Sequence, residues 1–254
     1  MKRLLLILVL FLACGTVSVD SPTRSCGKAV VPELPPSDDP LEVIILGDKY
    51  GIPTPGKFDQ VYAAAVAEAP DLMVSIGDIL DSAGLLSYSP VLYTTGNHDD
   101  DEILALGLPL YSDVIIDGIH FILIDNGTTL EIDSVQMEWL AGALTVPARW
   151  TLVFCHRMFW NYDMVDNQIN HELHNLFLAS GVDAVFAGHH HRWFPAEYDG
   201  IEYINVGRTA GFDTRTAPSF DYKDTTYVLP EVEPYGYVKV TIGESMQITF
   251  VEVQ

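Results

Sequence analysis

The chain has 254 residues, of which 48% are apolar, and 35 acidic residues against 13 basic ones give a formal net charge of −22. The apolar share is too high for a disordered chain, and the length suits a single α/β domain. The negative charge argues against binding to extended nucleic acid, whose backbone it would repel, and without any run of about 18 apolar residues we expect no transmembrane helix.

The N-terminus has the pattern of a secretory signal. Lys2 and Arg3 precede an apolar run that ends in Ala13-Cys14-Gly15. Residues 1–14 would then be a signal peptide, and the protein would be secreted or held in the cell envelope. The end of the run fits a lipoprotein signal that leaves a lipid anchor on Cys14, which we favour, or an ordinary small-x-small cleavage site. A buried strand or helix is the structural alternative.

Residues 15–40 predict a flexible linker, because they are rich in Pro, Ser and Asp and lack apolar periodicity. Residues 41–254 would form the folded domain. Cys26 lies in the linker and Cys155 in an apolar run, where we expect a small buried residue. Two cysteines so placed do not make a disulfide framework.

The domain begins with a strand–helix–strand pattern. We expect strands at 42–46 and 72–76, with a helix at 58–69 between them. Such a unit predicts parallel neighbouring strands and a right-handed crossover. Asp48 and Asp78 would then follow adjacent strands at one sheet edge, where ligands bind in such sheets.

Three further apolar runs also end in polar residues that can bind a metal. They end at Gly96-Asn97-His98-Asp99, at His156 and at Gly188-His189-His190-His191. One polar strand end alone is usually a turn, and a lone His is more often hydrogen-bonded in a core. Five such ends in one chain indicate a shared site, with His190 pointing away from it. Imidazoles, carboxylates and an amide without thiolates suit Mn, Fe or Zn.

The remaining patterns predict a hairpin, two helices and two half-exposed antiparallel strands. We expect them at 114–124 with a turn at Asp117-Gly118, at 133–144, at 168–179, at 238–242 and at 248–250. The alternation slips at Val251, which predicts a bulge or a strand end there.

The order of these motifs resembles the calcineurin-like metallophosphoesterase superfamily, whose relatives include the purple acid phosphatases. The matching stretches are Gly77-Asp78-Ile79-Leu80-Asp81, Gly96-Asn97-His98-Asp99, His156 and Gly188-His189-His190-His191, within residues 41–207. The resemblance implies an α/β fold, a four-layer α/β/β/α sandwich of two mostly mixed β-sheets with flanking helices.

The resemblance also implies a dinuclear metal centre. Asp78 would bridge two metal ions, Asp48 and His191 would hold one of them, and the other would be held by Asn97, His156 and His189. Two such ions, about 3.5–4 Å apart, activate a water for attack on the phosphorus of a small phosphomonoester or phosphodiester.

Two more residues receive roles from the resemblance. His98 would stay off the metals and protonate the leaving group as a general acid, and Asp81 would orient it. One position departs from the family pattern: where most members carry Asp-x-His, this chain has Asp48-Lys49-Tyr50. Purple acid phosphatases also lack that His but place a Tyr three residues after the bridging Asp, where this chain has Asp81. The first metal therefore lacks the usual fourth protein ligand unless Tyr50 serves.

Two other functions compete with the phosphoesterase. One is a non-catalytic metal-binding protein on the same fold. The other is a zinc peptidase, but His171-Glu172-Leu173-His174 lacks the His-Glu-x-x-His spacing. The short segment between Asp81 and Gly96 leaves no room for a large cap domain, so we expect an open cleft. Trp160 and Tyr162 in the loop after Arg157 would either contact a substrate ring or pack in the core.

Overall fold

The computed structural model describes eleven segments of the chain, and the statements below concern these. They are residues 10–13, 26–30, 39–49, 56–79, 91–99, 108–127, 131–160, 171–211, 219–222, 225–228 and 234–254.

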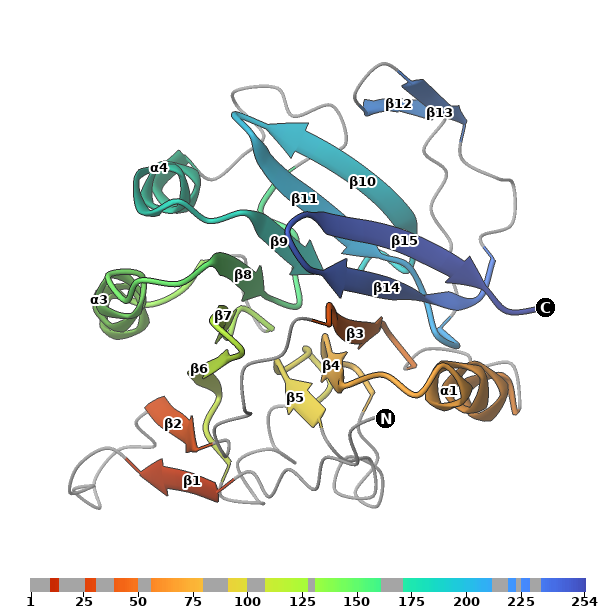
Figure 1. The fold of residues 1–254 in the computed structure, drawn as a ribbon, viewed down its shortest axis with the longest axis horizontal. Coiled ribbons are helices and arrows are strands. Elements are labelled where there is room, and N and C mark those ends of the chain that lie inside the picture. The colour runs from red at the N-terminus through yellow and green to blue at the C-terminus, as the bar shows by residue number, and fades with distance from the viewer. Residues whose placement is uncertain are drawn as a thin grey trace.

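One of the two main sheets has five strands in the order β15-β14-β3-β4-β5 (Figure 1). Strands β3, β4 and β5 are parallel, β14 pairs antiparallel with β3, and β15 pairs antiparallel with β14. Their bounds are Leu41–Leu46 for β3, Leu72–Ser75 for β4, Val91–Tyr93 for β5, Gly236–Ile242 for β14 and Met246–Glu252 for β15.

The second sheet has eight strands in the order β1-β2-β6-β7-β8-β9-β11-β10, with parallel and antiparallel neighbours. Their bounds are Leu10–Ala13 for β1, Cys26–Val30 for β2, Tyr111–Ile116 for β6, Ile119–Leu123 for β7, Trp150–Phe154 for β8, Ala184–Ala187 for β9, Trp193–Tyr198 for β10 and Ile201–Val206 for β11. A separate hairpin consists of β12 (Ser219–Tyr222) and β13 (Thr225–Val228).

The two sheets bury one hydrophobic core between their faces. Ile45 and Val74 of the five-stranded sheet belong to the same buried cluster as Phe121, Phe154 and Phe186 of the eight-stranded sheet. The three phenylalanine rings stack, with centroids 5.9 and 5.2 Å apart along the series. This core fixes the distance between the sheets and so the distance between the residues that leave their strands.

Helices cover both outer faces (Figure 1). Helix α1 (Lys57–Ala67) packs Phe58 and Val61 against the outer face of β3 and β4. Helices α3 (Ser134–Ala143) and α4 (His171–Ser180) pack against the outer face of the other sheet, where Leu140 and Phe177 lie buried. The order helix, sheet, sheet, helix confirms the predicted four-layer sandwich.

A helix cap and a hairpin turn form at the positions that the sequence predicts. The carboxylate of Asp133 accepts a hydrogen bond from the backbone N–H of Gln136 at 2.8 Å and caps α3. Asp117 and Gly118 turn the hairpin from β6 to β7 with φ values of 52° and 73°, as a two-residue turn with both residues left-handed requires.

The prediction of a bulge or strand end at Val251 is wrong. Strand β15 pairs with β14 residue by residue up to Glu252. Phe250 packs on the core between the sheets, whereas Val251 packs on the side covered by α1. Both faces of the strand are apolar at this point, so the alternation of the sequence fails while the strand continues.

Strands β1 and β2 lie in segments that the sequence analysis assigns to a signal and a linker. Strand β2 pairs in parallel with β6, from Cys26 opposite Tyr111 to Lys28 opposite Asp113. Residues 15–40 are therefore not irregular throughout, because the edge of β6 offers backbone partners that composition does not reveal. The boundaries at residues 14 and 40 remain predictions. None of the described helices is both long and apolar enough to cross a membrane.

Candidate metal centre

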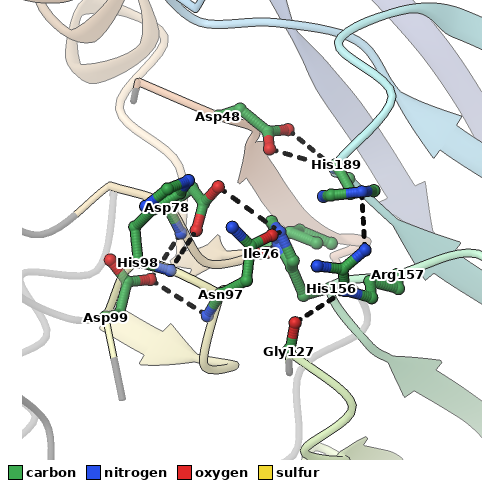
Figure 2. A network of polar contacts seen from close by, with 12 residues as sticks. Asp48, Ile76, Asp78, Asn97, His98, Asp99, Gly127, His156, Arg157 and His189 are labelled. Atoms are coloured by element: carbon green, nitrogen blue, oxygen red, sulfur yellow. Dashed lines mark hydrogen bonds and ion pairs between the residues drawn. The ribbon is translucent and has the colours of Figure 1, made fainter. Parts of the chain in front are cut away.

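The predicted ligands that the structure describes gather where strands of both sheets end (Figure 2). Asp48 and Asp78 follow β3 and β4, and Asn97 follows β5. His156 follows β8 and His189 follows β9, so the two sheets face each other across the site.

Asp78, His156 and His189 form a group that can hold a metal ion. Each offers one ligand atom, and the three atoms lie within 4.8 Å of one another. The Nε2 of His156 lies 3.5 Å from Oδ2 of Asp78 and 3.2 Å from Oδ1 of Asn97. The residues expected to share one metal are thus neighbours in space.

His156 is fully buried and oriented by the backbone of the opposite sheet. Its Nδ1 donates a hydrogen bond to the carbonyl oxygen of Ile76 at 2.8 Å, which leaves Nε2 facing Asp78. Burial lowers the pKa of His156, but the nearby carboxylates of Asp78 and Asp48 raise it by more, to about 9. The surroundings of this nitrogen therefore favour a positive charge.

Asp48 and His191 form the second half of the site. Oδ1 of Asp48 lies 3.3 Å from Nε2 of His191, and both carboxylate oxygens accept the backbone N–H of His189 at 3.0 Å. Burial raises the pKa of Asp48, but His191 and His156 outweigh it and lower the pKa to about 2. The carboxylate stays ionised, as a metal ligand must be.

The turn from Gly96 to Asp99 wraps around Asp78. The Asp99 carboxylate accepts hydrogen bonds from the N–H groups of Asp78 and of Gly96, the latter at 3.0 Å, and the N–H of His98 donates to Oδ1 of Asp78 at 3.0 Å. A Cβ on Gly96 would lie 2.1 Å from Oδ1 of Asp78, so only glycine fits here. Asp99 is buried while the side chain of His98 is exposed.

Three predicted ligands have left-handed backbone conformations. The φ angles are 53° for Asp78, 66° for His189 and 55° for His191. Such conformations cost on the order of 1–3 kcal/mol each in residues other than glycine, and they gather at functional sites.

Sequence reasoning missed Asn126, which clamps the turn at His156. Its Oδ1 accepts the N–H groups of His156 at 3.0 Å and of Arg157 at 2.9 Å, and its Nδ2 donates to the carbonyl of Arg157 at 2.6 Å. A signal was present, since Asp125-Asn126-Gly127 is another polar run directly after a strand.

Asp125 links the same loop to the neighbouring strand ends. The hydroxyl of Thr95 donates to its Oδ1 at 2.7 Å, and the side chain of Gln136 exchanges hydrogen bonds with its backbone at 2.7 and 2.8 Å. The loop after β7 is therefore fixed both to the Gly96 turn and to α3.

Some of the other residues named from the sequence lie in the described part of the chain, where their surroundings can be examined, and the rest lie outside it. Trp160 packs in the core against Phe159 and Tyr203, so it is not a substrate platform. His174 is buried and bonded to the hydroxyl of Tyr203 at 2.7 Å, outside the site. Tyr50, Asp81 and Tyr162 lie outside the described residues.

Comparison with known proteins identifies the fold. The model of the family described as calcineurin-like phosphoesterase matches residues 28–193. The chain belongs to this family. Its donor set also fits the implied ions, because two buried carboxylates, Asp48 and Asp78, face imidazole nitrogens and an amide oxygen.

Three similar proteins show the range of the family fold. Purple acid phosphatase 18 of Arabidopsis thaliana is 27% identical over 188 residues, which are 63% of this chain and 37% of that protein. The structure of purple acid phosphatase PPD1 from yellow lupin (Lupinus luteus) matches with a TM-score of 0.67 and 16% identity, over 90% of this chain and 54% of that one. GAP50, the anchor in the inner membrane complex of Plasmodium, matches with a TM-score of 0.61 and 15% identity, over 84% and 85%.

Proposed function

We propose that the chain is a metal-dependent phosphoesterase that hydrolyses small phosphomonoesters or phosphodiesters. The observation that carries the proposal is the convergence of Asp78, His156 and His189, with ligand atoms within 4.8 Å, beside the pair of Asp48 and His191. Two ions of Mn, Fe or Zn held there would supply Lewis acidity and a nucleophilic hydroxide.

The ligand roles follow the two halves of the site. In our proposal Asp78 bridges both ions. Asp48 and His191 would hold one ion, while Asn97, His156 and His189 would hold the other. Hydrogen bonds that His156 donates to the carbonyl oxygen of Ile76 and to Oδ1 of Asn126 keep its imidazole aimed at the site.

We assign His98 the role of general acid. Its backbone is fixed to Asp78 at 3.0 Å, yet its side chain is exposed beside the ligands rather than among them. In our proposal it donates a proton to the departing alkoxide, and Asp81 orients it.

The placement of basic residues supports an anionic substrate. The structure describes the side chains of seven Lys and Arg residues, which are Lys49, Lys57, Arg149, Arg157, Arg192, Arg208 and Lys239. Three of them directly follow Asp48, His156 and His191 in sequence, and the backbone of Arg208 bridges to Asp48. The guanidinium of Arg157 lies 2.8 Å from Nε2 of His189, whereas Lys49 lies over the ring of Phe58 and Arg208 over the ring of Tyr235, so the support for a negative ligand comes from Arg157.

We also propose that the protein works outside the cytoplasm, secreted or anchored through a lipid on Cys14. The support is the charged and apolar pattern of residues 1–14. A soluble domain on a short tether would meet small phosphorylated molecules at the membrane surface.

A non-catalytic role is the second candidate. It is favoured by the departure at Lys49-Tyr50 and by the likeness to GAP50, which is described as an anchor. Turnover separates the two candidates, since both predict metal binding.

The deciding experiment combines metal analysis with a substrate panel. Purified protein should bind about two ions per chain, and with Mn, Fe or Zn it should hydrolyse phosphomonoesters or diesters. Asp78→Asn, which changes one carboxylate to an amide of equal size, is the matched control and should lose both metal and turnover. Full metal occupancy without turnover on any phosphoester of the panel would reject the proposal and favour the binding protein.

A further inference from the structure

Arg157 links the end of β8 to a predicted metal ligand on the neighbouring loop. Its Nη1 lies 2.8 Å from Nε2 of His189, and its Nε donates to the carbonyl oxygen of Gly127 at 2.6 Å (Figure 2). Sequence reasoning assigned this arginine no role.

The contact with His189 has a fixed direction. A guanidinium has only donors, so Nε2 of His189 must be the acceptor and uses its lone pair for Arg157. The other ring nitrogen then carries the proton when the imidazole is neutral.

A metal on His189 is incompatible with this hydrogen bond. If the metal binds Nε2, it takes the lone pair that Arg157 uses. If it binds Nδ1, a neutral imidazole carries its proton on Nε2, which can then no longer accept from the guanidinium. In either case the hydrogen bond from Arg157 to His189 must break.

We propose that Arg157 exchanges partners when the site takes up metal. Without a cation it holds His189, and once displaced it binds an oxygen of the substrate's phosphoryl group. The second half of this proposal rests on the proposed phosphoesterase function. A guanidinium suits it, because its planar donors match phosphate oxygens.

The anchor of the guanidinium is independent of His189. The bond from Nε goes to Gly127, whose loop packs tightly on the Gly96 turn: a Cβ on Gly127 would lie 2.9 Å from the backbone oxygens of Thr95 and Gly96. The released donors would therefore stay beside the turn that carries His98.

Removing the side chain should leave the local backbone in place. Asn126 holds the N–H and the carbonyl of Arg157, and neither bond needs the guanidinium. Arg157→Met is thus a suitable variant. Arg149→Met is its matched control, since Arg149 is exposed and lies at the opposite end of the same strand β8.

The first test is titration of metal-free protein with Mn²⁺ by calorimetry. Arg157→Met should bind the ion about tenfold or more tightly than the wild type, because a competing charge-assisted hydrogen bond is gone. Arg149→Met should match the wild type. Unchanged or weaker binding in Arg157→Met would overturn the proposal, as it would show that the arginine does not compete with the metal.

The second test is binding of inorganic phosphate to the Mn²⁺-loaded proteins. Arg157→Met should lose about tenfold in phosphate affinity. Arg157→Lys should lose less, because lysine keeps the positive charge but lacks the planar pair of N–H donors of the guanidinium. Equal affinity in all variants would overturn the exchange of partners. Turnover of nitrophenyl phosphate by the wild type, measured in parallel, decides the phosphoesterase function separately.

Discussion

The Nδ1 of His156 lies 2.8 Å from the carbonyl oxygen of Ile76, so the end of one sheet orients a histidine at the end of the other. This bond ties the imidazole to the backbone just before Asp78. A metal ligand held in this way keeps one ring nitrogen for the ion.

We therefore expect His156→Ala to lose about one metal equivalent per chain and, with it, activity. The core between the sheets should keep the fold. Metal analysis and circular dichroism of the purified variant measure both. His174→Ala is the control, because His174 is also buried but is bonded to Tyr203 away from the site; it should keep its metals. Full occupancy in His156→Ala would show that His156 is not a ligand.

His98→Ala should keep both metals and lose roughly 10²–10⁴-fold in rate on alkyl phosphates, the usual contribution of a general acid. Nitrophenyl phosphate should be hydrolysed with a smaller loss, because nitrophenolate leaves without a proton. Steady-state rates on the two substrates test this. If both substrates slow equally, His98 acts in some other way.

Asn126→Leu should destabilise the protein and weaken metal binding together. It leaves the N–H groups of His156 and Arg157 without their acceptor, at about 1–3 kcal/mol for each unpaired group. Because the His156 turn loses its clamp, the metal dissociation constant should rise about 10–100-fold. Denaturant unfolding and calorimetric titration measure the two effects.

Two further variants test what the clamp does. Asn126→Asp keeps the accepting oxygen but loses the bond donated to the Arg157 carbonyl, so it should fall between wild type and Asn126→Leu. Gln136→Leu removes another buried amide, one that holds the backbone of Asp125. If it weakens metal binding as much as Asn126→Leu does, the role of Asn126 is general packing and not orientation of His156.

The strand ends could be predicted because several independent signals coincide there. An apolar run, a glycine and then a carboxylate or imidazole recur along the chain, and parallel strands bring such ends to one edge. The helix cap at Asp133 and the turn at Asp117-Gly118 could also be predicted, since both structures depend on neighbours in sequence.

What could not be predicted depends on contacts between distant segments. Strand β2 pairs with the distant strand β6 as well as with β1, and Trp160 packs against Tyr203 and Phe159. The hairpin from β10 to β11 was missed although Asp199-Gly200 repeats the turn signal, with φ values of 50° and 82°. Asn126 and Arg157 escaped notice because their roles lie in bonds to backbone and to another side chain.

The signal predicts a modified N-terminus. Mass spectrometry of the native protein should find a mature chain that begins at Cys14 and carries acyl groups. Cys14→Ala should abolish the modification and release the protein from the membrane fraction. A mature N-terminus at Thr16 or later would reject the anchor and keep secretion.

Tyr50, which lies outside the described residues, gives a prediction about the first metal. We expect it not to be a strong ligand, because a phenol has a reference pKa near 10 and reaches farther than an imidazole. The first metal should then exchange more readily than the second. An iron-loaded sample decides the matter in visible light. A purple or red band that disappears in Tyr50→Phe would prove tyrosinate coordination.

Strand β3, which Asp48 follows, lies between β4 and β14, and the bridges from Asp48 to Arg208 and from Arg208 to Tyr235 lead toward β14. A ribosome makes β3 early and β14 only near the end of the described chain. A nascent chain therefore holds Asp48 before the strands β14 and β15 that complete its sheet, so we expect the candidate metal site to form only after their synthesis. If the predicted signal exports the chain unfolded, the metals available outside the cytoplasm decide which ions the protein acquires.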